Sequence, residues 1–402
     1  MRKSLLMLLA GFLVSTLAAT ASAQDTVRLG LITPLTGTLS FGGNEVKNGV
    51  TMAIEQKKTL FGKPIELVVA DAPDSTAAVA EMERLHSREN LPVVFGGYGS
   101  ALEEAWQKVS EREKKLCLGT VNWADKLTEG GLQYFYRFAA PVKVLGSELV
   151  GFVNSATPEF LNKTPKNVKI IVVNSDLTGY VTAPILADLK SFGYADVTHE
   201  TYPSDLKDFT SIILKLRRAK PDILILSQYT ADGMAFRRQM VAMDYEPAIT
   251  LGAGLIYDQP EFADLGPKAA DGALAVSFTN PMMKPDVAPG LVEYKDEYIK
   301  RFGHPPLTHA LAAYAGALAY LETIEKAGSL DVEKIREELA KVEIPEGQTA
   351  AYWGMKFDDT HQNVLAKRCV VAQWKKGEYV VVWPEEFATQ KLELPLKPFS
   401  QR

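Results

Sequence analysis

Cysteine is scarce in this chain of 402 residues, which has only two, Cys117 and Cys369. Both lie in apolar stretches far apart in the sequence, and a chain of this length can build a core without disulfides. Two buried free thiols are therefore favoured over a bridge, although an oxidising compartment would permit one. Neither cysteine has a histidine or acid at a spacing typical of a nucleophile or a metal ligand.

Histidine is scarce as well, and the five present show no spacing typical of metal ligands. We expect each to be a surface or interface residue: His86, His199, His304, His309 and His361. The sequence has no Walker A motif and no Gly-x-Ser-x-Gly elbow, and Pro203 stands where a zincin helix starting at His199 needs its second histidine. Adjacent acids such as Glu103-Glu104 and Glu337-Glu338 diverge by about 100° around a helix, so we expect them on solvated faces. The sequence therefore predicts no enzyme, no cofactor and no metal site.

A long hydrophobic run occurs only near the N-terminus, where it follows Arg2 and Lys3 and extends from Leu5 to Leu17. As a helix this run rises only about 20 Å, short of the roughly 30 Å hydrocarbon core of a bilayer, which argues against the alternative of a membrane anchor. Ala21-Ser22-Ala23 follows as a small-residue cleavage site. Residues 1–23 are therefore predicted to be a secretory signal peptide that is cleaved on export.

The remaining chain, residues 24–402, has a modest excess of acid. Without Arg2 and Lys3 the basic residues fall from 44 to 42 against 49 acidic ones, a net charge of −7. The basic residues are scattered rather than clustered, which argues against a nucleic-acid partner. A chain of this length is too long for one hydrophobic core and is expected to form two domains.

Strand-like and helix-like segments alternate along the chain, which is typical of α/β proteins with parallel sheets. The pattern restarts after residues 134–140 and breaks again after residues 271–278, and the chain ends in a predicted hairpin with Gly377 in its turn. The first helix is expected to start near Glu45, after a loop through Gly42-Gly43. The main strands are expected at residues 27–33, 65–71, 93–96, 116–120, 168–174, 197–202, 223–227 and 249–252.

Four short fragments occur in the order and spacing of a known family. They are Gly30-Leu-Ile-Thr-Pro-Leu-Thr-Gly37, Gly96-Gly-Tyr-Gly-Ser100 at the start of a helix, Tyr136-Arg-Phe138, and Gln373-Trp374 with Val382-Trp-Pro384. Each fragment alone has low specificity, but together they make the mature chain resemble the leucine/isoleucine/valine-binding family of ABC-transporter solute-binding proteins. The chain departs from this family in lacking its early disulfide, since neither cysteine lies between Asp71 and Tyr98.

The resemblance implies an α/β chain with the type I periplasmic-binding-protein fold: two doubly wound lobes with parallel central sheets, joined by three crossover segments. We place the crossovers near Ala140, Ser277 and Ala351. Lobe one is then 24–140 plus 278–350, and lobe two is 141–277 plus 351–402. The resemblance also implies a periplasmic monomer that encloses a small organic ligand by hinge closure and delivers it to the membrane permease of an ABC importer. The alternative is the ligand-sensing subunit of a signalling system, which would use the same closure.

Ligands of open parallel sheets bind beyond the carboxyl ends of the strands. Ser100 follows such a strand and stands at or near the N-cap of the next helix, where unpaired N–H groups favour a carboxylate; an ordinary serine cap is the plain alternative. Trp123, at the tip of another loop, is either a wall of the ligand pocket or a packing residue. The predicted ligand-binding residues are Phe41, Tyr98, Gly99, Ser100, Thr120, Asn122, Trp123, Tyr180, Tyr229 and Gly254.

The class of ligand depends on one departure from the family. Family members that bind α-amino acids hold the ammonium group with an acid on the loop that here runs from Gly252 to Tyr257, and this chain has no acid there. An unpaired ammonium in a closed cleft is costly. The ligand is then an aromatic or aliphatic carboxylate, unless Asp176 or Asp258 supplies the charge for a branched-chain or other amino acid. Both classes stay open at this point.

Overall fold

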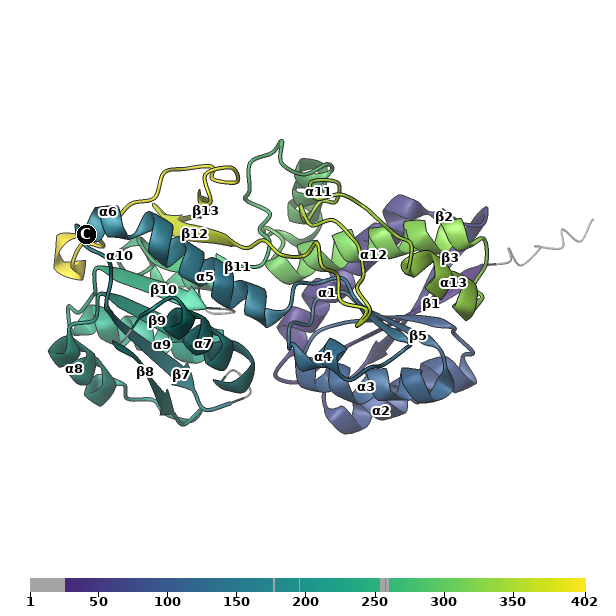
Figure 1. The fold of residues 1–402 in the computed structure, drawn as a ribbon, viewed down its shortest axis with the longest axis horizontal. Coiled ribbons are helices and arrows are strands. Elements are labelled where there is room, and N and C mark those ends of the chain that lie inside the picture. The colour runs from purple at the N-terminus through teal and green to yellow at the C-terminus, as the bar shows by residue number, and fades with distance from the viewer. Residues whose placement is uncertain (1–25, 176–177, 195, 254–256, 258–259) are drawn as a thin grey trace, which may run out of the picture.

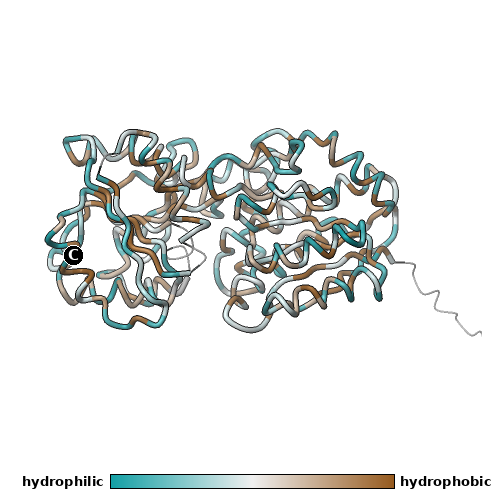
Figure 2. Tube along the Cα trace, turned by 60° about the horizontal axis from the view of Figure 1, so that its bottom comes forward, coloured by the Kyte–Doolittle hydropathy of each residue, from teal (hydrophilic) through white to brown (hydrophobic). Residues whose placement is uncertain are grey.

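The structure is a computed structural model that describes residues 26–175, 178–194, 196–253, 257 and 260–402. Its elements form two α/β halves, each built around its own sheet (Figure 1). Apolar segments gather inside both halves, and hydrophilic turns lie at the periphery (Figure 2). The predicted signal peptide lies outside the described residues. Within the described ranges, no helix has both the length and the apolar character that crossing a membrane requires.

The first sheet has six strands in the order β2-β3-β1-β4-β5-β6. All pairs are parallel except that between the short β2 and β3. The central strands are almost continuously apolar because helices cover both faces of the sheet. The strands are β1 (Val27–Thr33), β2 (Thr59–Leu60), β3 (Lys63–Asp71), β4 (Val93–Gly96), β5 (Leu116–Gly119) and β6 (Phe135–Arg137).

Helices pack on both faces of this first sheet. On one face, Leu29 and Leu31 of β1 share a core with α1 (Ser40–Lys57) and α12 (Thr308–Ala327). On the other, Ile32 shares a core with α2 (Ser75–Glu83) and α3 (Ser100–Glu113). A π-helical turn (Arg84–Arg88), α4 (Lys126–Glu129), α11 (Leu291–Phe302) and α13 (Val332–Leu339) complete this half.

The second sheet has seven strands in the order β13-β12-β11-β10-β9-β7-β8. The strands from β7 to β11 pair in parallel, and the hairpin β12–β13 joins β11 in antiparallel fashion. The strands are β7 (Asn167–Val173), β8 (Asp196–Tyr202), β9 (Ile223–Ser227), β10 (Ile249–Ala253), β11 (Leu274–Ser277), β12 (Val370–Lys375) and β13 (Glu378–Trp383).

Helices cover the second sheet on both faces too. Cores on its two faces contain α5 (Val142–Ala156) with α7 (Ala183–Ser191), and α8 (Thr210–Ala219) with α9 (Thr230–Ala242). The shorter elements of this half are α6 (Pro158–Leu161), a π-helical turn (Thr178–Thr182), 3-10 turns (Pro260–Leu265 and Phe399–Gln401) and α10 (Pro267–Ala270). The predicted α/β class with two doubly wound, mainly parallel sheets is confirmed.

The chain passes between the halves three times. It leaves the first sheet after β6 and continues into α5, returns after β11 to α11, α12 and α13, and then passes back to β12. Before the third passage, Gln362 forms a bridge with Arg137, and Asn363 Nδ2 donates to Phe138 O over 2.9 Å. We therefore propose that the third crossover follows Asn363 instead of lying near Ala351, with the other lobe bounds as predicted.

Arg137 lies at the first passage with its guanidinium buried. Its Nε donates to Gln362 Oε1 and its Nη1 to Ala124 O, each over 2.5 Å, and Nη2 donates to Thr128 Oγ1 over 3.2 Å. Burial lowers the pKa of Arg137 to about 10, so the side chain keeps its charge at neutral pH. This one residue connects β6, the loop before α4 and the segment just before the third passage.

Helix α1 begins at Ser40, so the expected loop through Gly42-Gly43 and helix start near Glu45 are wrong. Both glycines belong to the helix because neighbouring groups approach their backbone closely. A Cβ on Gly43 would lie 1.7 Å from Pro34 O, and one on Gly42 would lie 2.5 Å from Tyr98 Cε1. Tertiary packing here outweighs the low helix propensity of glycine.

Both cysteines are buried free thiols, as expected. The expectation that every histidine is a surface or interface residue is wrong for His86 and His309, which are buried. The ring nitrogens of His86 lie 2.8 Å from Leu91 O and 2.8 Å from Ser110 Oγ, and burial lowers its pKa to about 4. His86 is therefore a neutral core residue whose polar atoms both have partners.

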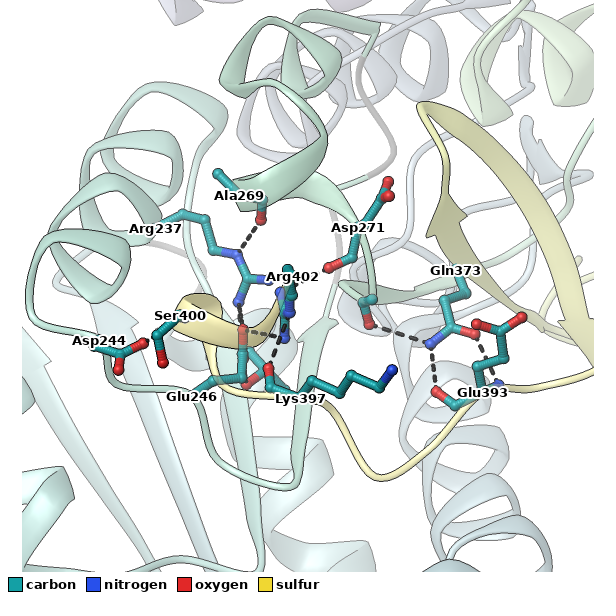
Figure 3. A network of polar contacts seen from close by, with 12 residues as sticks. Arg237, Asp244, Glu246, Ala269, Asp271, Gln373, Glu393, Lys397, Ser400 and Arg402 are labelled. Carbon is teal, nitrogen blue, oxygen red and sulfur yellow. Dashed lines mark hydrogen bonds and ion pairs between the residues drawn. The ribbon is translucent and has the colours of Figure 1, made fainter.

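A cluster of charged side chains in the second half joins Arg402 to Arg237 and Glu246 (Figure 3). Arg237 Nη1 lies 2.7 Å from Glu246 Oε2, and neither side chain has exposed surface. Arg402 Nη2 lies 3.0 Å from the same carboxylate oxygen, and Arg402 Nη1 donates to Asp271 O over 2.8 Å. Two cations thus share one buried carboxylate.

Replacement of the shared acid tests how much this cluster stabilises the fold. Glu246→Gln leaves the buried Arg237 and the partly exposed Arg402 without their counter-charge, so we expect the free energy of unfolding to fall by about 3 to 5 kcal/mol. The exposed pair Lys215–Glu200 gives the control, because Glu200→Gln should cost less than about 1 kcal/mol. Urea unfolding followed by circular dichroism measures both, and equal losses in the two variants would contradict this assignment.

Candidate ligand-binding cleft

A cavity of about 90 Å³ lies where the two halves meet. Its walls include loops that follow β4, β5 and β9, and therefore carboxyl ends of parallel strands. The first half contributes Leu39, Tyr98, Gly99, Ser100, Val121, Asn122, Trp123, Ala124 and His309, and the second half contributes Val142, Tyr180, Val181 and Tyr229. Residues from both halves thus share one site.

The N-terminus of α3 opens into this cavity. Gly99 is the N-cap residue, with a φ of +97° that favours glycine, and Ser100 is the first helical residue and not the cap itself. The first N–H groups of a helix have no intrahelical acceptor. Ser100 Oγ accepts from the Ala124 N–H over 3.3 Å, which leaves the serine hydroxyl hydrogen available for another acceptor. This end of the helix therefore presents donors to the cavity.

Aromatic rings form a wall of the cavity. The ring of Trp123 stacks on that of His309, with centroids 4.8 Å apart, and packs against Phe278 at 4.4 Å. Tyr98 meets His309 edge-on, also at 4.8 Å. Trp123 is thus both a wall residue and a packing residue, so its two predicted roles occur together.

His309 is a cavity residue that the sequence reasoning missed. It is only 2% exposed, and its Nε2 has no hydrogen-bond partner among the described residues. Burial lowers its pKa to about 3, so the imidazole is neutral at physiological pH. Its place just after Pro305-Pro306, at the start of the long apolar helix α12, is the signal that could have found it.

A buried acid lies behind the cavity wall, contrary to the expectation that Glu103 is on a solvated face. Its carboxylate accepts hydrogen bonds from Trp106 Nε1 over 2.6 Å, from Cys117 Sγ over 3.2 Å and from Asn122 Nδ2 over 2.5 Å. Trp106 lies on the same helix, but Cys117 belongs to β5 and Asn122 to the loop after it, so helical spacing alone could not predict the burial. Glu104 is partly exposed and pairs with Lys108, as expected of a solvated face.

The two halves also meet beside the cavity. The Lys126 ammonium, from the first half, lies 5.0 Å from the centroid of the Tyr180 ring, from the second. Lys126 also forms an ion pair with Glu104. Tyr180 packs against the apolar cluster of the first half that contains Leu102 and Leu127. Tyr180 is therefore a contact between the halves.

Most of the predicted site residues lie together, but not all. Tyr98, Gly99, Ser100, Asn122, Trp123, Tyr180 and Tyr229 line the cavity. Phe41 lies outside it and is 42% exposed, because α1 starts early and carries this side chain on its outer face. Thr120 is buried and donates to Gly96 O over 2.8 Å, which joins β5 to β4. Gly254 lies outside the described residues, as do Asp176 and Asp258.

The described lining residues include no acid, and the described residues contain no cluster of side chains that could hold a metal ion. The cavity therefore combines helix-end donors, aromatic walls and a neutral imidazole. This arrangement is suited to bind a small solute by contact and hydrogen bonding.

A family model described as periplasmic binding protein matches residues 26–378. The chain belongs to the periplasmic binding protein family. It is 32% identical over 389 residues to Leu/Ile/Val-binding protein homolog 7 of Brucella suis, an alignment that covers 94% of this chain and 96% of the relative. The resemblance seen in the four sequence fragments is confirmed.

Solved structures share the fold. The branched-chain amino acid transporter substrate binding protein LivJ from Streptococcus pneumoniae, in complex with isoleucine, has a TM-score of 0.76 at 20% identity and covers 90% of this chain and 100% of its own. An ABC-transporter solute binding protein from R. palustris, in complex with benzoate, has a TM-score of 0.74 at 16% identity. It covers 89% of this chain and 95% of its own. These likenesses confirm the predicted type I periplasmic-binding-protein fold.

Removal of Tyr180 tests the contact between the halves. In Tyr180→Ala we expect a more open arrangement and a larger radius of gyration in small-angle X-ray scattering. Lys126→Met should have a smaller effect, because an exposed cation–π pair contributes about 0.5 to 1 kcal/mol. Phe192→Ala, at a 59% exposed aromatic residue of the second half, is the control and should change nothing. A radius unchanged in Tyr180→Ala would rule out this role.

Proposed function

We propose that this chain captures a small organic carboxylate with an apolar body and delivers it to the permease of an ABC importer. The observation that carries the proposal is the N-terminus of α3 at Ser100, which opens into a cavity with aromatic walls. Helix N-termini favour anions through their free N–H groups and the helix dipole. The rings of Tyr98, Trp123 and His309 offer flat surface to the apolar part of the ligand.

Solved neighbours support a ligand of this kind. One holds isoleucine and another holds benzoate, which share a carboxylate and an apolar body. The neutral imidazole of His309 adds no charge to the cavity, so the anionic group depends on the α3 terminus. A ligand between the halves would contact both and stabilise their closed arrangement.

The remaining parts of the proposal concern transport. The protein is exported with its signal peptide, residues 1–23, which is then removed, and it acts in the periplasm as a monomer. It performs no catalysis. Closure of lobe one (24–140 plus 278–363) on lobe two (141–277 plus 364–402) presents the loaded form to the membrane permease. Members of its family are periplasmic binding proteins, which supports this assignment.

Substitution of Ser100 tests the carboxylate site. Ser100→Ala removes a hydroxyl donor from the α3 terminus, and we expect it to weaken carboxylate binding by about 1 to 3 kcal/mol, the range for a hydrogen bond to a charged group. The probes are leucine and benzoate, titrated by calorimetry into refolded, ligand-free protein. Ser147→Ala, at an exposed serine of α5, is the control and should leave affinity unchanged. Equal affinity in wild type and folded Ser100→Ala would exclude the role of the hydroxyl.

A further inference from the structure

The orientation of the Asn122 side chain limits what the cavity can recognise. Asn122 Nδ2 donates to Glu103 Oε2 and to Gly97 O, the latter over 2.6 Å. Neither an ionised carboxylate nor a carbonyl can donate, so an exchanged amide would set its oxygen against two acceptors. With both amide hydrogens directed at these partners, the group that Asn122 can offer a ligand is Oδ1, an acceptor.

The complete burial of the Glu103 carboxylate needs an explanation other than packing. It has no exposed surface, and an ionised carboxylate in such a place is costly even when its hydrogen bonds are made. Among its three hydrogen-bond donors, Asn122 is the one that lines the cavity. The effect of the buried charge therefore reaches the site through Asn122, whose amide it also polarises.

We propose that Glu103 is a positioning residue that holds Asn122 with its Oδ1 toward the ligand, and that the ligand carries a hydrogen-bond donor, an amino or hydroxyl group, beside its carboxylate. The inference rests on the function proposed above, because it assigns a second group to the same carboxylate ligand. It gives the site a negative charge close to that donor, in a chain whose Gly252 to Tyr257 loop has no acid.

The protonation of Glu103 makes this arrangement dependent on pH. Burial raises the pKa of Glu103 to about 7. The titratable groups facing it are Cys117 of β5 and Tyr320 of α12, whose pKa values burial raises well above their usual ones, and Arg137 of β6, whose pKa is lowered to about 10. Trp106, on its own helix, does not titrate. Glu103 is therefore the group in this set that changes charge near neutral pH.

Protonation of Glu103 weakens its hydrogen bond to Asn122. Oε1 contacts Trp106 Nε1 and Cys117 Sγ, and Oε2 contacts Asn122 Nδ2; a proton on either oxygen removes the negative charge that strengthens the hydrogen bond from Asn122. Asn122 is thus held most firmly above about pH 7 and less firmly as the pH falls below it. The preference for a ligand with a donor group is expected to fall in the same direction.

Matched ligands provide the first test. Carboxylates that raise the melting temperature are compared at pH 8 by calorimetry in sets with one skeleton: leucine, 2-hydroxy-4-methylpentanoate and 4-methylpentanoate, and phenylalanine, 3-phenyllactate and 3-phenylpropanoate. We expect the amino or hydroxy member to bind at least tenfold more tightly than the unsubstituted acid, and the two substituted members identify the donor. Equal or tighter binding of the unsubstituted acids overturns this inference alone. If no carboxylate raises the melting temperature, the function proposed above fails as well.

Variants then separate positioning from general structural support. Glu103→Gln should reduce the preference for the donor-bearing ligand at least fivefold, whereas Glu113→Gln, the same change at the other end of α3, should preserve it. Asn122→Ala should remove the preference, and Glu103→Gln should add nothing in that background. A preference unchanged in folded Glu103→Gln would overturn the role.

The pH dependence of the ligand preference gives a further test in wild-type protein. In wild-type protein the preference should fall at least threefold between pH 8 and pH 6, because Glu103 gains its proton in this range. The Asn122→Ala variant should show no such pH dependence. A preference that is constant in wild type over this range would overturn the inference even if Glu103→Gln could not be purified in folded form.

Discussion

The buried guanidinium of Arg137 constrains the rest of the molecule. A cation in the interior must have its hydrogen bonds satisfied, because an unsatisfied one is strongly destabilising. Arg137 satisfies them with Gln362, just before the third passage, and with Ala124 and Thr128 beside the cavity. The crossover segments and the loop that carries Asn122 are therefore fixed by the same planar group. A displacement of the crossover segments relative to this loop would break hydrogen bonds of Arg137.

A single helix end serves two opposite tasks in the cleft. Ser100 and the free N–H groups of α3 face the cavity, and Glu103 lies in the first turn of the same helix. The positive end of the helix dipole thus favours a ligand anion on its open side and stabilises a buried carboxylate on its inner side. Recognition of a carboxylate and of a neighbouring donor group can therefore arise within one helical turn and the loop packed beside it.

The sequence predicted those features that depend on local pattern. Apolar runs gave the main strands to within two residues, including the four-residue β4 and β5, whereas β2 and β6 have two and three residues and offer too little pattern to detect. The four-residue β11 was not among the expected strands. The Gly-rich loop before Ser100 pointed to residues that line the candidate cavity. The start of α1, and with it the position of Phe41, depends on the close approach of Pro34 and Tyr98, which a local reading cannot anticipate. The same holds for His309, whose ring packs against Tyr98 and Trp123, and for Glu103, whose partners include Cys117 of β5 and Asn122 of the loop after it.

The exposed position of Lys126 links the cleft to its surroundings. Its attraction to the Tyr180 ring and to Glu104 acts across partly exposed surface, where dissolved salt screens charges over about 8 Å at physiological ionic strength. Of these two interactions, the one with Tyr180 joins the halves, and it is expected to weaken as the salt concentration rises. We therefore expect the two halves to separate more readily in brine than in fresh water.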